Sequence, residues 1–243
     1  MNNINKGKKG PSGYSWRKGT KHFRYEDGFR LLSRDISLVE KAERGEIFAV
    51  FDGIGSAPEG ARAAIHMCDA LIGFFRGNEK FPATPEGLMS LLLEANSAIF
   101  NWGFIEGTDR PKGGCAGTIA WSNGERLLVF HAGDTTGLLA REGQTSFLTQ
   151  PHQTDDGAIW EYFGRGPNLT IDVTEARLEE GDRVLLFSDG VTKVLHPIEA
   201  ASLVMPEPDN LRAADLLVER TRLLGSTDDI TAVVVDFEEL WPI

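Results

Sequence analysis

Three short apolar segments of this chain each meet an acidic step at one end, and they restrict the possible folds more than any other feature. The segments are residues 48–51 before Asp52 and Gly53, residues 184–188 before Asp189 and Gly190, and residues 230–235 after Asp228 and Asp229. Carboxylates at the ends of buried strands repel one another and lose their hydration unless something neutralises them. The usual neutraliser of several converging Asp oxygens is a hard divalent cation such as Mg²⁺ or Mn²⁺.

A single Asp-Gly step is weak evidence for a metal, because Asp-Gly is also the commonest turn dipeptide. For any one step the turn is the better interpretation. Three acidic steps beside strongly apolar strands, far apart in the sequence, favour the metal. If these strands are neighbours in two packed sheets, Asp52, Asp189 and Asp228 face one space and form a cation site made only of oxygens.

Length and composition favour one large domain. The 243 residues are long for one domain and short for two, and the hydrophobic content of 41% supports a real core. We expect residues 1–12 to be a flexible tail and residues 13–243 to form a single domain. The basic start of the chain has no apolar segment behind it, and no window is long and apolar enough to span a membrane. We therefore expect a cytoplasmic protein without membrane association.

The charge and the cysteines exclude several kinds of function. The net charge of −11 disfavours nucleic-acid binding. Cys68 and Cys115 make neither a disulfide framework nor a zinc site. Cys115 lies in a glycine-rich segment, residues 113–117, but a cysteine-based phosphatase would need an Arg six residues further on, where Trp121 stands.

The spacing of apolar residues predicts an α+β sandwich. Helices are expected over residues 58–77, over residues 84–107 with a capping start at Thr84, and around residues 213–220. Strands are expected at residues 29–39, 47–51, 117–121, 127–131, 137–140, 183–188 and 230–237, and the first two should form a hairpin. Residues 152–168 are polar and glycine-rich, so we expect a loop over the site with at most one short helix. This order of elements fits an α+β sandwich better than a βαβ alternation.

The chemistry of such a site is that of phosphate ester hydrolysis. With two cations about 3.5–4 Å apart, a bridging water loses a proton near neutral pH and becomes a nucleophile. The cations also take up charge on the phosphoryl oxygens. The residues alone therefore predict a metal-dependent hydrolase.

The chain resembles the metal-dependent protein phosphatase family of type 2C (PPM), which removes phosphate from Ser and Thr. The matching motifs follow the family's order from about residue 13 to residue 237, and as an ordered set they are specific. They are residues 25–27, 51–53, 117–118, 132–135, 148–149, 181–182, 188–190 and 227–231. The resemblance implies a four-layer α-β-β-α sandwich, with two antiparallel β-sheets flanked by helices and the metals at one end.

The resemblance also implies roles for individual residues. Asp52 would bridge both metals, and the Gly53 carbonyl would bind one of them. Glu26 would reach a metal directly or through water. Asp189 and Asp228 would complete the coordination of the other metal.

Three further assignments leave alternatives open. Asp134 resembles a residue that holds a weak third ion together with Asp189, but a strand-end turn explains it nearly as well. The alternative for Glu26 is an exposed acid. Asp229 stands where the family usually has Asn, and it is either a hydrogen-bond acceptor beside the site or a turn residue.

Two departures from the family bear on the substrate. Where many members have an Arg four residues before the Glu to hold the substrate phosphate, this chain has His22, flanked by Lys21 and Arg24. Each of these three could bind phosphate as a cation, but the bidentate grip of Arg at that position would be lost. Ile54 stands where many eukaryotic members have a His, which favours a bacterial-like member.

We therefore predict hydrolysis of phosphoserine and phosphothreonine in proteins by a hydroxide that bridges two divalent cations, Mn²⁺ or Mg²⁺. Asp52, Asp189 and Asp228 would be the catalytic acids. The alternative is a catalytically silent, phosphatase-like regulatory binding module, which the altered phosphate position alone supports. A relative specialised for one small regulatory protein would share the chemistry. The expected partners are a phosphorylated protein and a cognate Ser/Thr kinase acting in trans, with no nucleic acid and no membrane.

Overall fold

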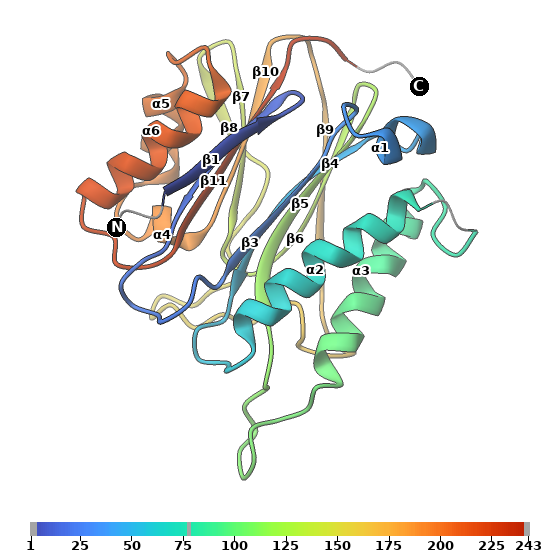
Figure 1. The fold of residues 1–243 in the computed structure, drawn as a ribbon, viewed down its shortest axis with the longest axis vertical. Coiled ribbons are helices and arrows are strands. Elements are labelled where there is room, and N and C mark those ends of the chain that lie inside the picture. The colour runs from blue at the N-terminus through green and yellow to red at the C-terminus, as the bar shows by residue number, and fades with distance from the viewer. Residues whose placement is uncertain (1–3, 77–78, 241–243) are drawn as a thin grey trace.

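Two antiparallel sheets pack face to face in the computed structural model, which describes residues 4–76 and 79–240 (Figure 1). The six-stranded sheet has the order β1 (Ile4–Lys9), β2 (Ser12–Arg17), β11 (Ile230–Phe237), β10 (Asp182–Phe187), β7 (Thr136–Arg141) and β8 (Gln144–Phe147). The five-stranded sheet has the order β3 (Asp27–Leu32), β4 (Glu46–Gly53), β5 (Cys115–Asn123), β6 (Arg126–Ala132) and β9 (Asp172–Arg177). All of these strand pairs are antiparallel.

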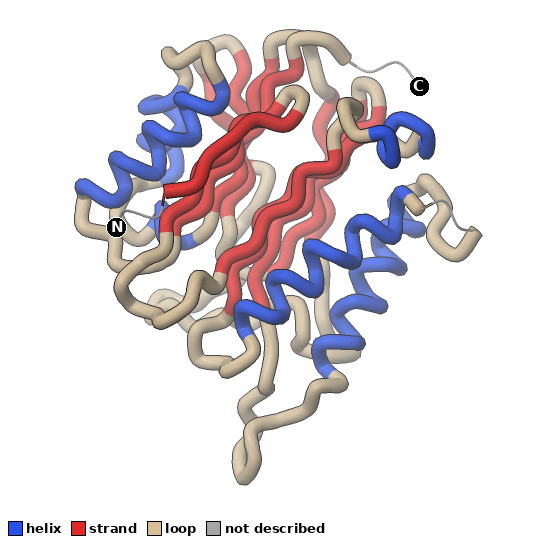
Figure 2. Tube along the Cα trace, in the orientation of Figure 1, coloured by secondary structure: helices blue, strands red, loops and turns tan. Residues whose placement is uncertain are grey.

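Helices cover the outer face of each sheet (Figure 2). The five-stranded sheet is covered by α2 (Gly60–Phe75) and α3 (Pro85–Phe100). The six-stranded sheet is covered by α5 (Pro197–Val204) and α6 (Asn210–Leu223), with the short α4 (Asp189–Thr192) at its end. A further short helix, α1 (Ser37–Ala42), connects β3 to β4. The predicted four-layer α-β-β-α sandwich is confirmed.

The central strands are buried on both faces. In β4, Phe48 and Val50 lie in the core between the sheets, whereas Ile47, Ala49 and Phe51 belong to the core under α2 and α3. The strands β10 and β11 divide their side chains in the same way between the inner core and the core under α6. A strand that is covered on both sides has no reason to alternate apolar with polar residues. This explains the continuous apolar segments of the sequence.

The start of α3 is set by its capping residue. The Thr84 side chain accepts a hydrogen bond from the Gly87 N–H at 3.1 Å, and Pro85 occupies the first turn. Both features are typical of a helix N-terminus. The predicted start is confirmed, but the helix ends at Phe100 and not at Gly107.

The prediction of one strand over residues 29–39 is wrong beyond Leu32. The chain leaves the sheet there and forms α1 at Ser37–Ala42, which packs on α2. The strands on either side pair antiparallel as predicted, with Phe29 opposite Val50. Residues 152–168 form a loop without a helix.

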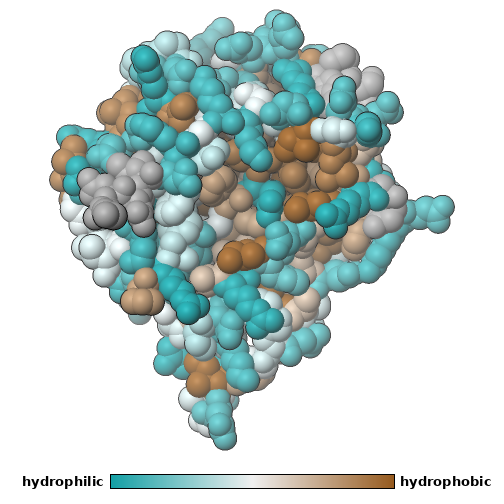
Figure 3. All heavy atoms as spheres, viewed as in Figure 1, coloured by the Kyte–Doolittle hydropathy of each residue, from teal (hydrophilic) through white to brown (hydrophobic). Residues whose placement is uncertain are grey.

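The prediction of a flexible tail over residues 1–12 is wrong from residue 4 onwards, and residues 1–3 lie outside the described residues. Residues 4–9 form β1 and pair with β2. The Lys8 ammonium lies 2.8 Å from Asp209, and Lys6 pairs with Asp215 on α6. These ion pairs hold a basic segment against an acidic helix face, and a lysine-rich strand is typical of a sheet edge. Figure 3 shows hydrophilic side chains over most of this face, with hydrophobic ones gathered beside α1.

Candidate metal centre

The acids at the strand ends gather at one end of the sandwich, the lower end in Figure 1. Asp52 lies at the end of β4, Asp189 follows β10, and Asp228 precedes β11. Asp134 lies in the turn between β6 and β7. All four line one cleft of about 530 Å³, together with Gly53, Lys21, His22 and Lys193.

Backbone pairing holds these positions in register. Asp27 at the start of β3 lies directly opposite Asp52 at the end of β4. The Gly53 N–H donates to the Glu26 carbonyl oxygen at 3.1 Å, which brings Glu26 beside the end of β4. The Ser188 N–H donates to the Thr231 carbonyl oxygen at 3.1 Å, so Asp189 and Asp228 extend from neighbouring strands.

Crowding shifts the protonation of these acids. Burial raises the pKa of Asp52 well above its ordinary value, and the nearby Asp189, Asp27 and Asp134 raise it further. Burial and then Asp189 raise the pKa of Asp134 to about 7, although Lys193 opposes the change. Like charges in a space with little water disfavour ionisation. Asp52 and Asp134 are therefore held less readily as anions than ordinary carboxyl groups, and nearby positive charge would favour their ionised forms.

Asp27 is a member of this cluster to which the sequence interpretation gave no role. It is buried, and burial raises its pKa to about 8 although a hydrogen bond from the Thr231 hydroxyl, at 2.5 Å, opposes the shift. Its other oxygen, Oδ1, has no hydrogen-bond partner among the described residues. The sequence signal for Asp27 was its place directly after Glu26, but only the β3–β4 register shows that it faces Asp52.

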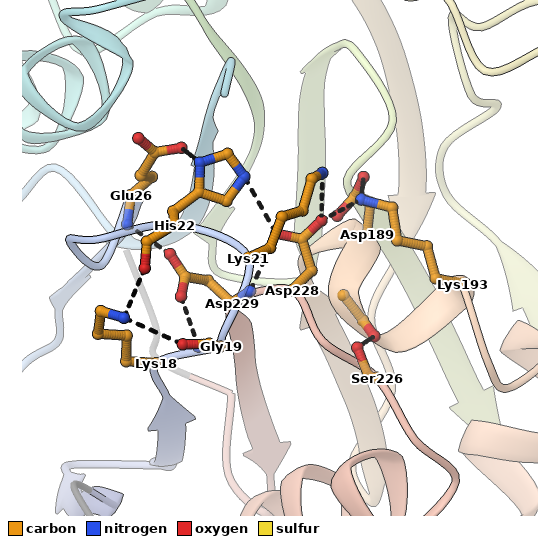
Figure 4. A network of polar contacts seen from close by, with 11 residues as sticks. Lys18, Gly19, Lys21, His22, Glu26, Asp189, Lys193, Ser226, Asp228 and Asp229 are labelled. Atoms are coloured by element: carbon orange, nitrogen blue, oxygen red, sulfur yellow. Dashed lines mark hydrogen bonds and ion pairs between the residues drawn. The ribbon is translucent and has the colours of Figure 1, made fainter. Parts of the chain in front are cut away.

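Two lysines neutralise part of the cluster (Figure 4). Lys193 Nζ lies 2.5 Å from Asp228 Oδ2 and also pairs with Asp189, while Lys21 Nζ lies 2.9 Å from Asp228 Oδ2. Burial alone would raise the pKa of Asp228, but the hydrogen bonds from Lys193 and Lys21 outweigh it and hold this pKa at about 2. The sequence interpretation gave Lys193 no role. Its spacing of four residues from Asp189 was the available signal.

His22 connects Glu26 to the cleft. Its Nδ1 lies 2.8 Å from Glu26 Oε2, and its Nε2 lies 3.9 Å from Asp228 Oδ1. Burial raises the pKa of Glu26, with the opposing effect of His22 second in size. Glu26 itself does not line the cleft, and Arg24 is exposed and outside it. Of the three predicted phosphate-binding residues, the structure thus brings Lys21 and His22 to the cleft.

Asp229 holds the loop that carries His22 and Glu26. Its Oδ1 accepts the Gly19 N–H at 2.7 Å, and its Oδ2 accepts the Glu26 N–H at 2.6 Å. Asp229 is therefore a hydrogen-bond acceptor, and this was one of the two interpretations left open by the sequence. An Asn could accept only one of these bonds, because its amide nitrogen is a donor. A side chain at Gly19 would lie 2.3 Å from the Asp228 carbonyl, so the close approach of this loop requires glycine.

The arrangement of the carboxylates is that of a lysine-neutralised cluster. Among residues 4–76 and 79–240, no group of three or more His, Cys, Asp or Glu side chains is arranged so that it could hold a metal ion. Lys193 contacts Oδ2 of both Asp189 and Asp228, and Lys21 also contacts Oδ2 of Asp228. The donor set is nevertheless made of oxygens, crowded and short of positive charge, which is the chemistry that Mg²⁺ and Mn²⁺ prefer. The roles of these residues as metal ligands remain predictions.

The family model for protein phosphatase 2C matches residues 30–228. The chain belongs to the protein phosphatase 2C family. The matched range includes Asp52, Asp134, Asp189 and Asp228, whereas the loop with His22 and Glu26 precedes it. The predicted family is confirmed, and this membership identifies the chain as a protein phosphatase domain of the 2C type.

Curated relatives carry the same family name. The chain is 26% identical to "Probable protein phosphatase 2C 11" of Arabidopsis thaliana over 258 residues, which covers 93% of this chain and 66% of that protein. It is 25% identical to "Probable protein phosphatase 2C 59" of Oryza sativa, covering 79% of this chain and 67% of that protein. For human "Protein phosphatase 1E" the identity is 25%, over 83% of this chain and 31% of that protein. The match with this chain thus spans about two thirds of each of the two plant proteins and about a third of the human one.

Solved structures share the fold over nearly the whole chain. The Mycobacterium tuberculosis serine/threonine phosphatase PstP/Ppp superposes with a TM-score of 0.77 at 22% identity, covering 94% of this chain and 98% of that one. The catalytic domain of PstP in complex with two manganese ions has a TM-score of 0.74 at 23% identity, over 93% of this chain and 96% of that one. At this identity the likeness shows the fold. Within the described residues, no helix is long and apolar enough to cross a bilayer.

Proposed function

We propose that this phosphatase 2C domain removes phosphate from phosphoserine and phosphothreonine in proteins with two divalent cations, Mn²⁺ or Mg²⁺. The observation that carries the proposal is the crowding of Asp52, Asp134 and Asp189 in one cleft, where burial and mutual repulsion raise the pKa values of Asp52 and Asp134. A bound cation would offset the repulsion among these buried carboxyl groups, so the site favours cation binding. The manganese ions of the PstP catalytic domain, which shares this fold, support the same proposal.

The chain's own residues would hold these ions as the family resemblance implies. Asp52 and the Gly53 carbonyl would hold ions, and Glu26 would reach one of them directly or through water. Asp189 and Asp228 would complete the binding of the other ion. Asp134 would hold a weak third ion together with Asp189. When bound, the cations would activate a water as the nucleophile and stabilise charge on the phosphoryl oxygens.

Basic side chains of the 19–26 loop would bind the substrate phosphate. Lys21 and His22 line the cleft beside Asp228, so either can face a phosphate that enters it. Arg24 is exposed outside the cleft, and we assign it no contact with the phosphoryl group. The cognate kinase, the physiological phosphoprotein and the cytoplasmic location remain predictions.

The test is hydrolysis of a phosphothreonine peptide by the purified chain. We expect turnover with Mn²⁺, loss of turnover with excess EDTA, and recovery after Mn²⁺ is restored. Turnover that is indifferent to EDTA would contradict the metal mechanism.

The second candidate is a catalytically silent binding module. Its specific support is that Lys193 and Lys21 already pair with Asp189 and Asp228. A silent module should show no turnover of any phosphopeptide at any Mn²⁺ concentration, yet bind a phosphopeptide in a titration. The same peptide assay therefore separates the two candidates.

A further inference from the structure

Lys193 forms ion pairs with two acids of the cleft, Asp189 and Asp228. Its Nζ lies 2.5 Å from Asp228 Oδ2 and pairs with Asp189 Oδ2 as well (Figure 4). Both carboxylates are largely shielded from water, with side-chain exposures of 17% for Asp189 and 14% for Asp228. The ammonium group thus joins an acid at the start of α4, just after β10, to an acid in the loop before β11.

The local backbone keeps Lys193 in this place. Asp189 begins α4 and Lys193 is its C-cap, so the two side chains lie one helical turn apart. The Lys193 N–H donates to the Asp189 carbonyl oxygen at 3.0 Å, which closes this turn. A cation tethered so closely has a high effective concentration at its two carboxylates.

We propose that Lys193 competes with a divalent cation for Asp189 and Asp228, so that an ion binds this pair of acids only after the Lys193 side chain has moved out. The inference rests on the proposed metal-dependent function. Mg²⁺ requires oxygens at about 2.0–2.1 Å and a strict geometry. An oxygen that accepts an ammonium hydrogen bond cannot also make such a bond without bringing two positive charges close together.

Lys21 differs from Lys193 in two ways that make it a matched control. It pairs with Asp228 alone, and its side chain is 52% exposed. Lys21 also lies on the 19–26 loop, whereas Lys193 lies one helical turn from Asp189 on α4. The removal of Lys21 changes the charge of the cleft by the same amount but leaves Lys193 paired with both acids.

The experiment is a calorimetric titration of the full chain with MnCl₂, comparing the wild type with Lys193→Met. We expect the variant to bind one additional Mn²⁺, or to bind its weakest ion at least about tenfold more tightly. Lys193→Arg keeps the charge and should bind Mn²⁺ as the wild type does. Lys21→Met should show a smaller gain, and Lys8→Met, on the distant edge strand, should show none.

Thermal unfolding provides a second readout that does not depend on activity. In EDTA, Lys193→Met should melt at a lower temperature than the wild type, because two carboxylates lose their partner. Saturating Mn²⁺ should then raise its melting temperature by more than it raises that of the wild type. Lys193→Gln, which keeps a donor without the charge, should behave in the same way if Lys193→Met fails to fold.

The outcomes separate this inference from the proposed function. Equal Mn²⁺ stoichiometry and affinity in the wild type and both neutral variants would overturn the role of Lys193 while leaving the metal centre intact. A gain as large in Lys21→Met would show a general charge effect and would also overturn it. Failure of every protein to bind Mn²⁺ would overturn the metal centre itself, and the inference with it.

Discussion

Asp27 and Asp52 lie directly opposite each other where β3 pairs with β4, so two buried carboxyl groups share one end of the ladder. Burial and neighbouring acids raise the pKa of both. Such a pair is costly in the metal-free protein and becomes useful when a cation is present. Removing a carboxyl group at this end of the ladder should therefore raise the stability of the metal-free protein and lower its activity.

Asp52→Asn should abolish turnover and stabilise the metal-free protein. The change removes one acid from among Asp27, Asp134 and Asp189, and an amide at this place cannot serve as an anionic ligand. We expect phosphopeptide turnover to fall at least about 10³-fold. In EDTA, a gain of about 1 kcal/mol should raise the melting temperature by about 2–4 °C.

The matched control is Thr84→Ala, which removes the α3 cap far from the cleft. It should cost about 1 kcal/mol of stability without changing turnover per folded molecule. Wild-type turnover by Asp52→Asn would contradict the assignment of Asp52.

The stability of the metal-free protein should fall as the pH rises. The unfolded chain has Asp27 ionised above about pH 4, whereas in the folded state its pKa is about 8. The folded state therefore binds more protons across this window, and its advantage is lost as the pH approaches the folded value. Asp27 contributes at most about 1.4 kcal/mol per pH unit. Asp134, with a pKa of about 7, acts in the same direction.

Denaturant unfolding in EDTA at several pH values between about 5.5 and 8.5 measures this slope. Asp27→Asn should flatten it, because the variant has no proton to lose at that position. A slope that is the same in the wild type and the variant would show that Asp27 titrates at its ordinary value.

Asp229→Ala should loosen the loop that carries His22 and Glu26. The variant loses both backbone hydrogen bonds, to Gly19 and to Glu26. We expect a loss of about 2–3 kcal/mol in the free energy of unfolding and a lower turnover. Asp229→Asn keeps one acceptor and should lie between the wild type and Asp229→Ala, so equal losses in both variants would contradict this account.

His22→Ala should weaken the binding of the substrate phosphate. His22 lines the cleft, with its Nε2 3.9 Å from Asp228 Oδ1, and no other residue that lines the cleft supplies an imidazole ring. We expect KM for a phosphopeptide to rise about tenfold, which corresponds to about 1.4 kcal/mol. His22→Arg should lower KM below that of the alanine variant, because a guanidinium grips phosphate with two hydrogen bonds. An unchanged KM in His22→Ala would assign phosphate binding to Lys21 instead.

Much of the fold could be predicted from local patterns. The strands β4, β10 and β11 are buried on both faces, so each appears in the sequence as a continuous apolar segment. The start of α3 is indicated by its N-cap residue, Thr84. Of the four edge strands, β1, β8 and β9 could not be predicted in this way. The strand β1 is rich in lysine and depends on ion pairs with α6, whose residues lie about two hundred positions away in the sequence. The polar strands β8 and β9 each pair with one neighbouring strand only, β7 and β6 respectively, and their sequences carry no continuous apolar segment.

The sequence by itself determined which acids stand at the ends of buried strands, since Asp52, Asp189 and Asp228 each border an apolar segment. Only the tertiary structure decided what surrounds them. It places Lys193 and Lys21 on their oxygens, turns Arg24 outwards, and sets Asp27 opposite Asp52. The physical reason is that strand burial leaves a local periodic signal, whereas the contacts of a charged side chain depend on sheet register and on loops from distant parts of the chain.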